Sequence, residues 1–404
     1  MSKATADGVS EEVLTLGEVF PDGCVIERLR DHQLLLWQNG EERIAPSLTW
    51  NGQVYTAARL DPKMEELLRL PAASADSVTI QDLVTELSSA IANYVGVEAD
   101  AALLIACFAL STWVIDGLPG SVCLNPWGPT GTETTLVELL ACICRRPLRL
   151  VEPSLRELAG LPEGLCPTLI LKQPSEQVLS RLLAAAHDSS IHLLHSGRAV
   201  SLRCAPVACT QYPVSLPALS IPLAPAETRY RRINRERAQQ LAEVFQPQLL
   251  RYRLEQHQQV ANSEFDEVKF APETRVLARI LGATLEGAPE VQARIVGALL
   301  TLDHQIRVEQ AQTTTAVILE GVLALLHEGR EAAFVQEITE ISNAILFARN
   351  DRRELTAKEV GGTLRKELAV ITKRRGPGYE VSLTAELQSR VHPACCCPQR
   401  PHAA

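Results

Sequence analysis

The sequence predicts an α/β protein with a parallel sheet at its core, a small β-rich module before the core and a helix-rich C-terminal domain that ends in a basic hairpin. The 404 residues are 46% hydrophobic but only 4% aromatic, so the core is built mainly from Leu, Ala, Val and Ile, which favours helix with some buried strand. Short apolar segments alternate with helical ones in the middle of the chain. A strand, a glycine-containing loop and a helix follow one another between residues 120 and 144.

Charge and cysteine content narrow the class of protein. The formal net charge of −9 opposes a protein coated in nucleic acid, although it leaves room for a local basic surface. The longest apolar run, Ala101 to Ile115, is too short to cross a bilayer, and the first 20 residues lack the pattern of a signal peptide. Eleven cysteines, eight of them scattered singly, fit a reducing environment. We therefore expect a cytoplasmic protein without a membrane span.

The N-terminal segment predicts a β-rich module. Short alternating runs surround Asn39-Gly40 and Asn51-Gly52, and both dipeptides are typical of two-residue hairpin turns. A short helix over Pro62 to Leu70 and a Pro-, Ala- and Ser-containing linker, Pro71 to Asp76, close the module.

The next segment predicts a sheet covered by helices. Helical spacing over Thr79 to Tyr94 and Ala101 to Ile115 precedes a strand at Gly120 to Leu124, a loop at Asn125 to Thr132 and a helix at Thr134 to Cys144. More strands are expected at 168–171, 191–194, 200–204, 207–209 and 219–223, with a helix at 178–186. This alternation favours a parallel sheet with helices on its faces.

The loop after the first strand is a candidate phosphate loop. An intact P-loop, G-x-x-x-x-G-K-[ST], cradles phosphates with its backbone N–H groups, neutralises their charge with Lys and holds Mg²⁺ with its hydroxyl. Residues 128–135 read GPTGTETT, which is one residue short of the common form and has Glu133 in place of Gly-Lys. The candidate nucleotide-binding residues of this degenerate site are Gly128, Gly131, Thr132, Thr134 and Thr135.

Two charge changes oppose ordinary ATP hydrolysis. The Glu133 carboxylate repels a polyphosphate. The strand at 168–171 is followed by Lys172-Gln173 and not by the acid that positions Mg²⁺ in working enzymes. ATP and Mg²⁺ remain the candidate ligands, and no cofactor is certain; the alternative is an ordinary strand-to-helix turn in a structural core.

Five segments carry a resemblance to a known family: 103–110, 127–131, 145–147 (Arg-Arg-Pro), 167–171 and 218–223. Their arrangement resembles the AAA-like P-loop ATPase modules of phage and plasmid primase-helicase proteins, over roughly residues 80 to 390. The resemblance implies ATP-driven work on DNA and, in some relatives, ring assembly. Arg231, Arg232, Arg235 and Arg237 could then serve as a trailing arginine finger, although a solvated helix start is the simpler interpretation.

The last third of the chain predicts a winged helix-turn-helix. A helix at 316–326, a strand at 333–335 and a helix at 338–348 precede a third helix that begins at the capping box Thr356-Ala-Lys-Glu359. Two strand-like arms then surround Gly376-Pro-Gly378. This order of elements is typical of a winged helix.

The winged helix is also the most basic part of the chain. Residues 349–390 hold ten Lys or Arg and six Asp or Glu. The candidate nucleic-acid-binding residues are Lys358, Arg365 and Lys366 on the third helix and Lys373, Arg374 and Arg375 on the wing. The alternative is a protein-interaction or lid module whose charges are merely solvated.

The tail beyond Val391 predicts no site. Cys395, Cys396 and Cys397 are adjacent, and adjacent cysteines cannot easily surround one tetrahedral metal ion, so we expect no metal there.

Together these patterns predict five segments. They are a β-rich module (1–75), a degenerate P-loop-NTPase-like core (76–230), a helical lid or connector (231–312), a winged helix (313–392) and a disordered tail (393–404). The expected function is a DNA-associated, ATPase-like accessory protein of replication or mobile-element type, with DNA and a second copy or a replication protein as partners. An active ATP-dependent DNA helicase or a protein-interaction scaffold are the alternatives.

Overall fold

The computed structural model describes residues 12–162, 164–188, 190–195, 197–214, 218–224, 233–311, 313–366, 369–376 and 378–388. The chain forms two compact units, one up to Leu300 and one from Thr301 onward. The boundary falls inside helix α9 (Pro289–Ala311). Each unit is described separately below.

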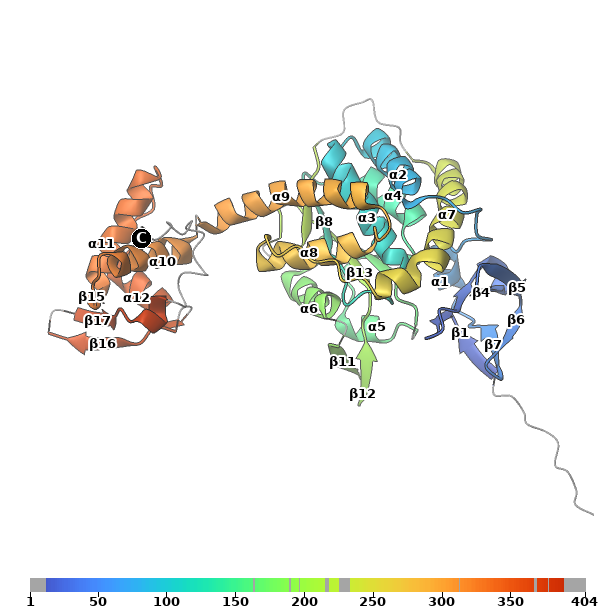
Figure 1. The fold of residues 1–404 in the computed structure, drawn as a ribbon, viewed down its shortest axis with the longest axis horizontal. Helices are drawn as coiled ribbons and strands as arrows, with labels where there is room; N and C mark the ends of the chain where they lie inside the picture. The colour runs from blue at the N-terminus through green and yellow to red at the C-terminus, as the bar shows by residue number, and fades with distance from the viewer. Residues whose placement is uncertain are drawn as a thin grey trace, which may run out of the picture. The chain divides into compact units, whose positions relative to one another are not determined.

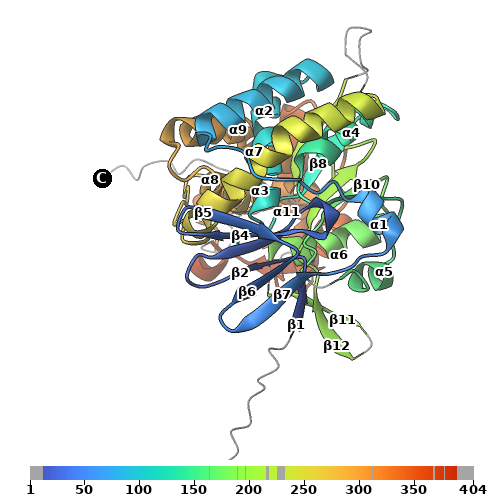
Figure 2. The ribbon, with the colours of Figure 1, turned by 90° about the vertical axis from the view of Figure 1, so that its right-hand side faces the viewer.

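The N-terminal β-rich module consists of two small sheets (Figure 2). One has the order β1-β7-β6 and the other β2-β3-β4-β5. The strands are β1 (Glu12–Thr15), β2 (Gly17–Val19), β3 (Val25–Arg28), β4 (Leu34–Gln38), β5 (Glu41–Ala45), β6 (Ser47–Trp50) and β7 (Gln53–Ala57). Both predicted hairpin turns are confirmed, because Asn39-Gly40 and Asn51-Gly52 have positive φ at both residues. Ile26, Leu34, Leu48 and Tyr55 fill the space between the sheets.

The core of the first unit is a five-stranded sheet in the order β14-β8-β13-β10-β9, and every neighbouring pair is parallel (Figure 1). Its strands are β8 (Leu124–Trp127), β9 (Pro147–Leu150), β10 (Thr168–Lys172), β13 (Ala205–Cys209) and β14 (Leu219–Pro222). The predicted α/β class, with a parallel sheet at its core, is confirmed.

Helices cover the sheet. Leu169 and Leu171 of β10 pack with Leu158 of α5 and Leu182 of α6. Figure 1 shows α5 and α6 apart from the group formed by α2, α3, α4 and α7. Helix α3 is almost completely buried, as its predominantly apolar sequence requires. The helices of this unit are α1 (Pro62–Leu67), α2 (Ile80–Val95), α3 (Ala99–Trp113), α4 (Thr134–Ile143), α5 (Leu155–Ala159), α6 (Glu176–His187), α7 (Arg235–Ala261), α8 (Pro272–Ala283) and the start of α9.

Two strand predictions were wrong in detail. The first core strand begins at Leu124, where the predicted one ended, because the buried Asn125 side chain donates to Ala208 O and Thr210 Oγ1 and so behaves as a strand residue. The segments near 191–204 do not join the parallel sheet. They form the separate antiparallel pair β11 (His192–His195) and β12 (Arg198–Ser201), and β9 was not predicted at all.

The second unit has the order of elements of a winged helix. Helices α10 (Thr314–His327), α11 (Val335–Ala348) and α12 (Ala357–Lys366) pack with a sheet of order β15-β17-β16. Its strands are β15 (Ala332–Phe334), β16 (Thr372–Arg375) and β17 (Gly378–Ser382). The capping box before α12 is present, since Glu359 N donates to Thr356 Oγ1 and Thr356 N donates to Glu359 Oε2.

The sequence predicts neither a membrane span nor a metal site. Among the described residues no single helix is long and apolar enough to cross a membrane. Helices α2 and α3, which are bent by 120° at a short break, together have the length and composition of a span. The part of the chain that the structure describes contains no group of three or more His, Cys, Asp or Glu arranged to hold a metal ion. The Cys395 to Cys397 run lies outside the described residues.

Candidate functional site

The candidate phosphate loop lies where the sequence placed it, between β8 and α4. Strand β8 ends at Trp127 and helix α4 begins at Thr134. The two strands beside β8 are β13 and β14, which follow it much later in the chain. Open α/β sheets bind ligands beyond the carboxyl ends of their strands at such a point of changing strand order. The loop therefore has the location of a nucleotide site.

The two glycines of the loop are required for different structural reasons. Gly128 N donates to Thr210 O at 3.1 Å, and a Cβ added at residue 128 would lie 2.5 Å from Leu223 O. Only glycine lets the loop approach the end of β14 this closely. Gly131 has a φ of +99° with open space beside it, so its requirement is conformational.

Glu133 turns its carboxylate back onto the loop. Its Oε2 accepts a hydrogen bond from Gly131 N at 2.7 Å, and its Oε1 lies 3.3 Å from Lys172 Nζ. Lys172 is the last residue of β10 and its side chain is 57% exposed, whereas that of Glu133 is only 13% exposed. A carboxylate at the N-terminus of α4 also has a favourable interaction with the helix dipole.

The threonine hydroxyls of the loop are engaged locally. Thr132 Oγ1 donates to Pro129 O at 2.8 Å, and Thr134 Oγ1 donates to Gly131 O at 3.0 Å. Thr135 is half-buried in the first turn of α4. Two of the three predicted hydroxyls therefore already bond to the loop backbone.

Cys209 lies beside the Glu133–Lys172 pair. It is the last residue of β13 and is 3% exposed. Burial and, to a smaller extent, the Glu133 carboxylate raise the pKa of its thiol to about 12, against the lowering effect of Lys172. Cys209 is thus a neutral, buried neighbour of the pair and not an activated nucleophile.

The geometry shows what the sequence reasoning missed. The sequence analysis treated Glu133 and Lys172 as two separate losses, one in the loop and one after β10. The structure joins them, because β10 lies near enough to β8 for a side chain at its end to reach the loop. The signal in the sequence was that residues 133 and 172 both carry the opposite charge to the residues expected there in an intact P-loop site.

Arg145 and Arg146, part of the family-like pattern, belong to a buried charge cluster and not to the loop. Glu27 of β3 accepts from Arg145 Nη2 at 2.7 Å, Arg146 Nη2 at 2.5 Å and Arg253 Nε of α7 at 2.9 Å. Arg253 also makes a bidentate pair with Asp116, at 2.7 and 2.6 Å. The cluster links the β-rich module to the sheet and to α7.

The arginines determine the charge state of this cluster. Burial alone would raise the pKa of Glu27, but Arg145, Arg146 and Arg253 outweigh it and hold that pKa at about 2. Burial and the neighbouring Arg145 lower the pKa of Arg146 to about 10. Glu27 and Arg146 are therefore both charged at neutral pH.

The candidate arginine finger receives no support from α7. Arg231 and Arg232 lie outside the described residues. Arg237 donates to the Tyr94 hydroxyl through Nε and to Gln240 Oε1 through Nη1 at 3.0 Å. Its guanidinium group is held within its own unit, and Arg235 is the exposed first residue of the helix.

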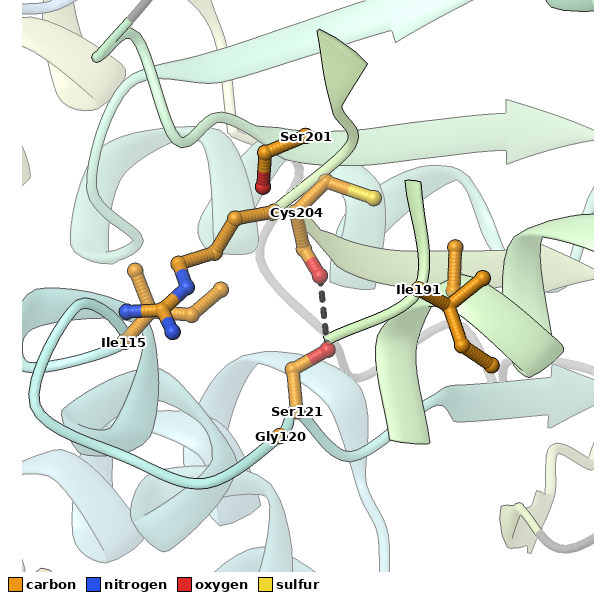
Figure 3. A pocket seen from close by; sticks show the side chains of 8 residues that line it. Ile115, Gly120, Ser121, Ile191, Ser201 and Cys204 are labelled. Atoms are coloured by element: carbon orange, nitrogen blue, oxygen red, sulfur yellow. Dashed lines mark hydrogen bonds between the residues drawn. The ribbon is translucent and has the colours of Figure 1, made fainter. Parts of the chain in front are cut away.

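The small cavity beside Ser121 offers no alternative active site. It is lined by residues that include Ile115, Ser121, Ser201 and Cys204, and Ser121 Oγ donates to Cys204 O at 2.6 Å (Figure 3). Its volume is about 10 Å³, which is the limit for a single water molecule. No substrate of ordinary size fits there.

The basic residues of the winged helix are exposed, as predicted. Lys358, Arg365 and Lys366 lie on α12, and Lys373, Arg374 and Arg375 form most of β16. Arg375 pairs with Glu380 at 3.1 Å. Arg365 donates to Gly361 O and lies 5.7 Å from the centre of the Tyr379 ring. The other four make no ion pair with a described residue.

Comparisons with known proteins find similar structures but no matching sequence. No family model and no curated protein matches the sequence. The structure is similar to the C-terminal region of NrS-1, with a TM-score of 0.37 at 10% identity over 89% of this chain and 95% of that one. It is also similar to Cdc6p from Pyrobaculum aerophilum (TM-score 0.20, 13% identity, 71% and 90% covered) and to the Aeropyrum pernix ORC1 protein in complex with DNA (0.19, 14%, 79% and 93%). At these values the likeness carries no argument about function, which rests on the geometry described above.

Proposed function

We propose that this chain is a DNA-associated accessory protein of replication or mobile-element type, in which the winged helix binds duplex DNA and the nucleotide site no longer drives work. The observation that carries the proposal is the set of exposed, largely unpaired cations on α12 and β16. The class of function is binding and not catalysis.

The charge pattern suits a phosphate backbone. Lys358, Lys366, Lys373 and Arg374 have no carboxylate partner among the described residues, so an approaching phosphate need not displace one. Each phosphate contact releases condensed counterions, and this release gives affinity without base recognition. A net negative chain that keeps such cations together on one small domain confines its DNA contact to that domain.

The local fold suits the same role. Helix α12 is short and has its apolar face against the core of its unit, through Val360 and Leu364, while its charged residues face outward. In winged-helix and helix-turn-helix proteins the equivalent helix enters the major groove. The wing, β16 with β17, then supplies backbone contacts.

The phosphate loop supports binding in preference to ATP hydrolysis. Lys172, a cation beside the loop, already pairs with Glu133 at 3.3 Å. No carboxylate stands at the end of β10 to hold Mg²⁺. An active ATPase or helicase, the alternative, would require this pair to open.

A protein-interaction role for the winged helix is the second candidate, and a specific observation favours it. Phe347 at the end of α11 is 84% exposed and Ile371 before β16 is 78% exposed. Large apolar side chains that are exposed to solvent are typical of protein contact surfaces when they form a patch.

Duplex DNA binding measured by fluorescence anisotropy over a range of salt concentrations tests the proposal. In the full chain, Lys373→Ala with Arg374→Ala is expected to weaken binding and to reduce the slope of log affinity against log salt by about 2, since each lost phosphate contact removes about 0.9. Sequence preference should change little.

The matched control removes the same charge from the same unit. Arg307→Ala with Arg330→Ala removes two arginines that pair with Asp303 and Glu337, and Arg330 lies at the end of the sheet away from the wing turn. This variant should bind DNA with an unchanged slope. Equal slopes for both variants, or no salt-dependent binding by the natural chain, would overturn DNA contact through the wing and favour the protein-interaction role.

A further inference from the structure

We propose that the loop between β8 and α4 is an anion site whose resident ligand is the chain's own Glu133 carboxylate. The inference concerns the first unit and does not depend on DNA binding by the second. It accounts for a carboxylate that accepts from a backbone N–H of the loop in a chain without the lysine of an intact P-loop.

The charges at two linked positions, 133 and 172, are reversed relative to an intact P-loop site. An intact P-loop puts a cation in the loop, and the strand that corresponds to β10 ends in an acid. Here the loop has an acid, Glu133, and β10 ends in a cation, Lys172. The two groups lie 3.3 Å apart, so the attraction between loop and strand is kept although both signs are exchanged.

The positions of the Glu133 carboxylate oxygens support the same assignment. Glu133 Oε2 accepts from Gly131 N, a backbone donor of the kind that a phosphate oxygen would occupy in an intact loop. Glu133 Oε1 faces Lys172 Nζ. One carboxylate therefore meets a backbone N–H and an ammonium group, which are the two kinds of partner that a bound phosphate needs.

The state of the surrounding donors supports it as well. Gly128 N and the hydroxyls of Thr132 and Thr134 bond to backbone carbonyls, so the loop holds its shape with internal partners. Glu133 is mostly covered whereas Lys172 is mostly exposed. A free phosphate would have to displace a tethered carboxylate, which competes without the entropy cost of binding from solution.

The consequence is that the loop is closed without nucleotide and opens to an anion only when Glu133 is removed. In Glu133→Ala the Gly131 N–H and the Lys172 ammonium group both lose their partner. They then form a site for a compact polyanion of the phosphate class. Glu133→Gln keeps the size of the side chain and an acceptor oxygen but loses the charge, so it is the conservative second variant.

The test is calorimetric titration of the full chain with sodium pyrophosphate at constant ionic strength, together with melting temperatures. We expect no binding to the natural chain. Glu133→Ala should melt at a lower temperature and bind pyrophosphate with an affinity at least about fivefold above the detection limit for the natural chain, the factor that corresponds to one exposed ion pair of about 1 kcal/mol. Its melting temperature should then rise with the logarithm of pyrophosphate concentration.

Three further variants separate the proposal from a general loss of negative charge. Adding Lys172→Ala to Glu133→Ala should abolish the rescue by pyrophosphate. Glu133→Gln should show the rescue in weaker form. Glu138→Ala removes another carboxylate of α4, one that pairs with the half-exposed Arg149, and should show none. Rescue in Glu138→Ala, absence of rescue in both Glu133 variants, or equal binding by the natural chain would each overturn the internal-ligand assignment.

Discussion

The two units of this chain treat charge in opposite ways. In the first unit, the groups of interest are paired: Glu27 and Asp116 with three buried arginines, and the largely covered Glu133 with the exposed Lys172. In the second unit, cations are turned outward, and four of the six on α12 and β16 have no described carboxylate partner. The first unit thus pairs the carboxylate of its loop within the chain, while the small second unit keeps four exposed cations without a described carboxylate partner.

The difference teaches where to look for function in a chain with degraded motifs. An ion pair whose two charges are both satisfied within the chain has no free charge with which to bind a ligand. Burying such a pair contributes at most to stability or to the specificity of the fold. Exposed cations without partners keep their interaction free energy available for a phosphate. The proposed DNA contact follows from this contrast and not from the family resemblance.

The largest expected effect on stability comes from removing Glu27, the carboxylate that three buried arginines share. Glu27→Ala leaves Arg145, Arg146 and Arg253 buried without their shared carboxylate, and losing one partner of a buried ion pair costs about 3–5 kcal/mol. Urea unfolding followed by tryptophan fluorescence measures this loss for the first unit alone, because all four tryptophans lie at positions 37, 50, 113 and 127.

The matching change in the second unit should have little effect on stability. Glu320→Ala removes one ion-pair partner of the half-exposed Arg349, and such surface pairs contribute about 0–1 kcal/mol. Because this unit has no tryptophan, circular dichroism follows its unfolding. A loss below about 1 kcal/mol in Glu27→Ala would show that the buried cluster contributes no more than a surface pair, and the contrast between the units would fail.

Acid should break the same cluster more gradually. The pKa of Glu27 is lowered from 4.5 to about 2 in the folded chain, so its contribution to stability is complete above pH 4.5 and disappears as the pH falls toward 2. A shift of this size corresponds to about 3 kcal/mol. The tryptophan-monitored free energy of unfolding should therefore fall between pH 4.5 and pH 2, and it should fall less in Glu27→Gln. An equal fall in both proteins would assign the acid sensitivity to other carboxylates.

Secondary-structure elements were predicted from the sequence more accurately than contacts between residues far apart in the chain. The hairpin turns at Asn39-Gly40 and Asn51-Gly52 and the capping box at Thr356 depend on local chemistry, and all three are present. The start of β8 was misplaced because Asn125 reads as a loop residue until Ala208, far along the chain, accepts from its amide.

The candidate loop shows the same limit. Its position followed from the order of strand, glycines and helix, which is local information. The contact between Glu133 and Lys172 depends on which strands are neighbours in the sheet, and hydrophobic periodicity does not determine strand order. The Arg145-Arg146 pair was read as part of a family pattern, and only the fold shows that it meets Glu27, more than a hundred residues earlier.

The most direct test of the account is the affinity of the natural full chain for duplex DNA, measured by anisotropy with and without ATP and Mg²⁺ at one salt concentration. The account predicts salt-dependent binding with the same dissociation constant in both conditions, because the loop that would bind the nucleotide already holds its own carboxylate. A change of about fivefold or more, the size of an ordinary coupling between two sites, would mean that ATP binds and acts on the DNA-binding unit, and it would contradict the account.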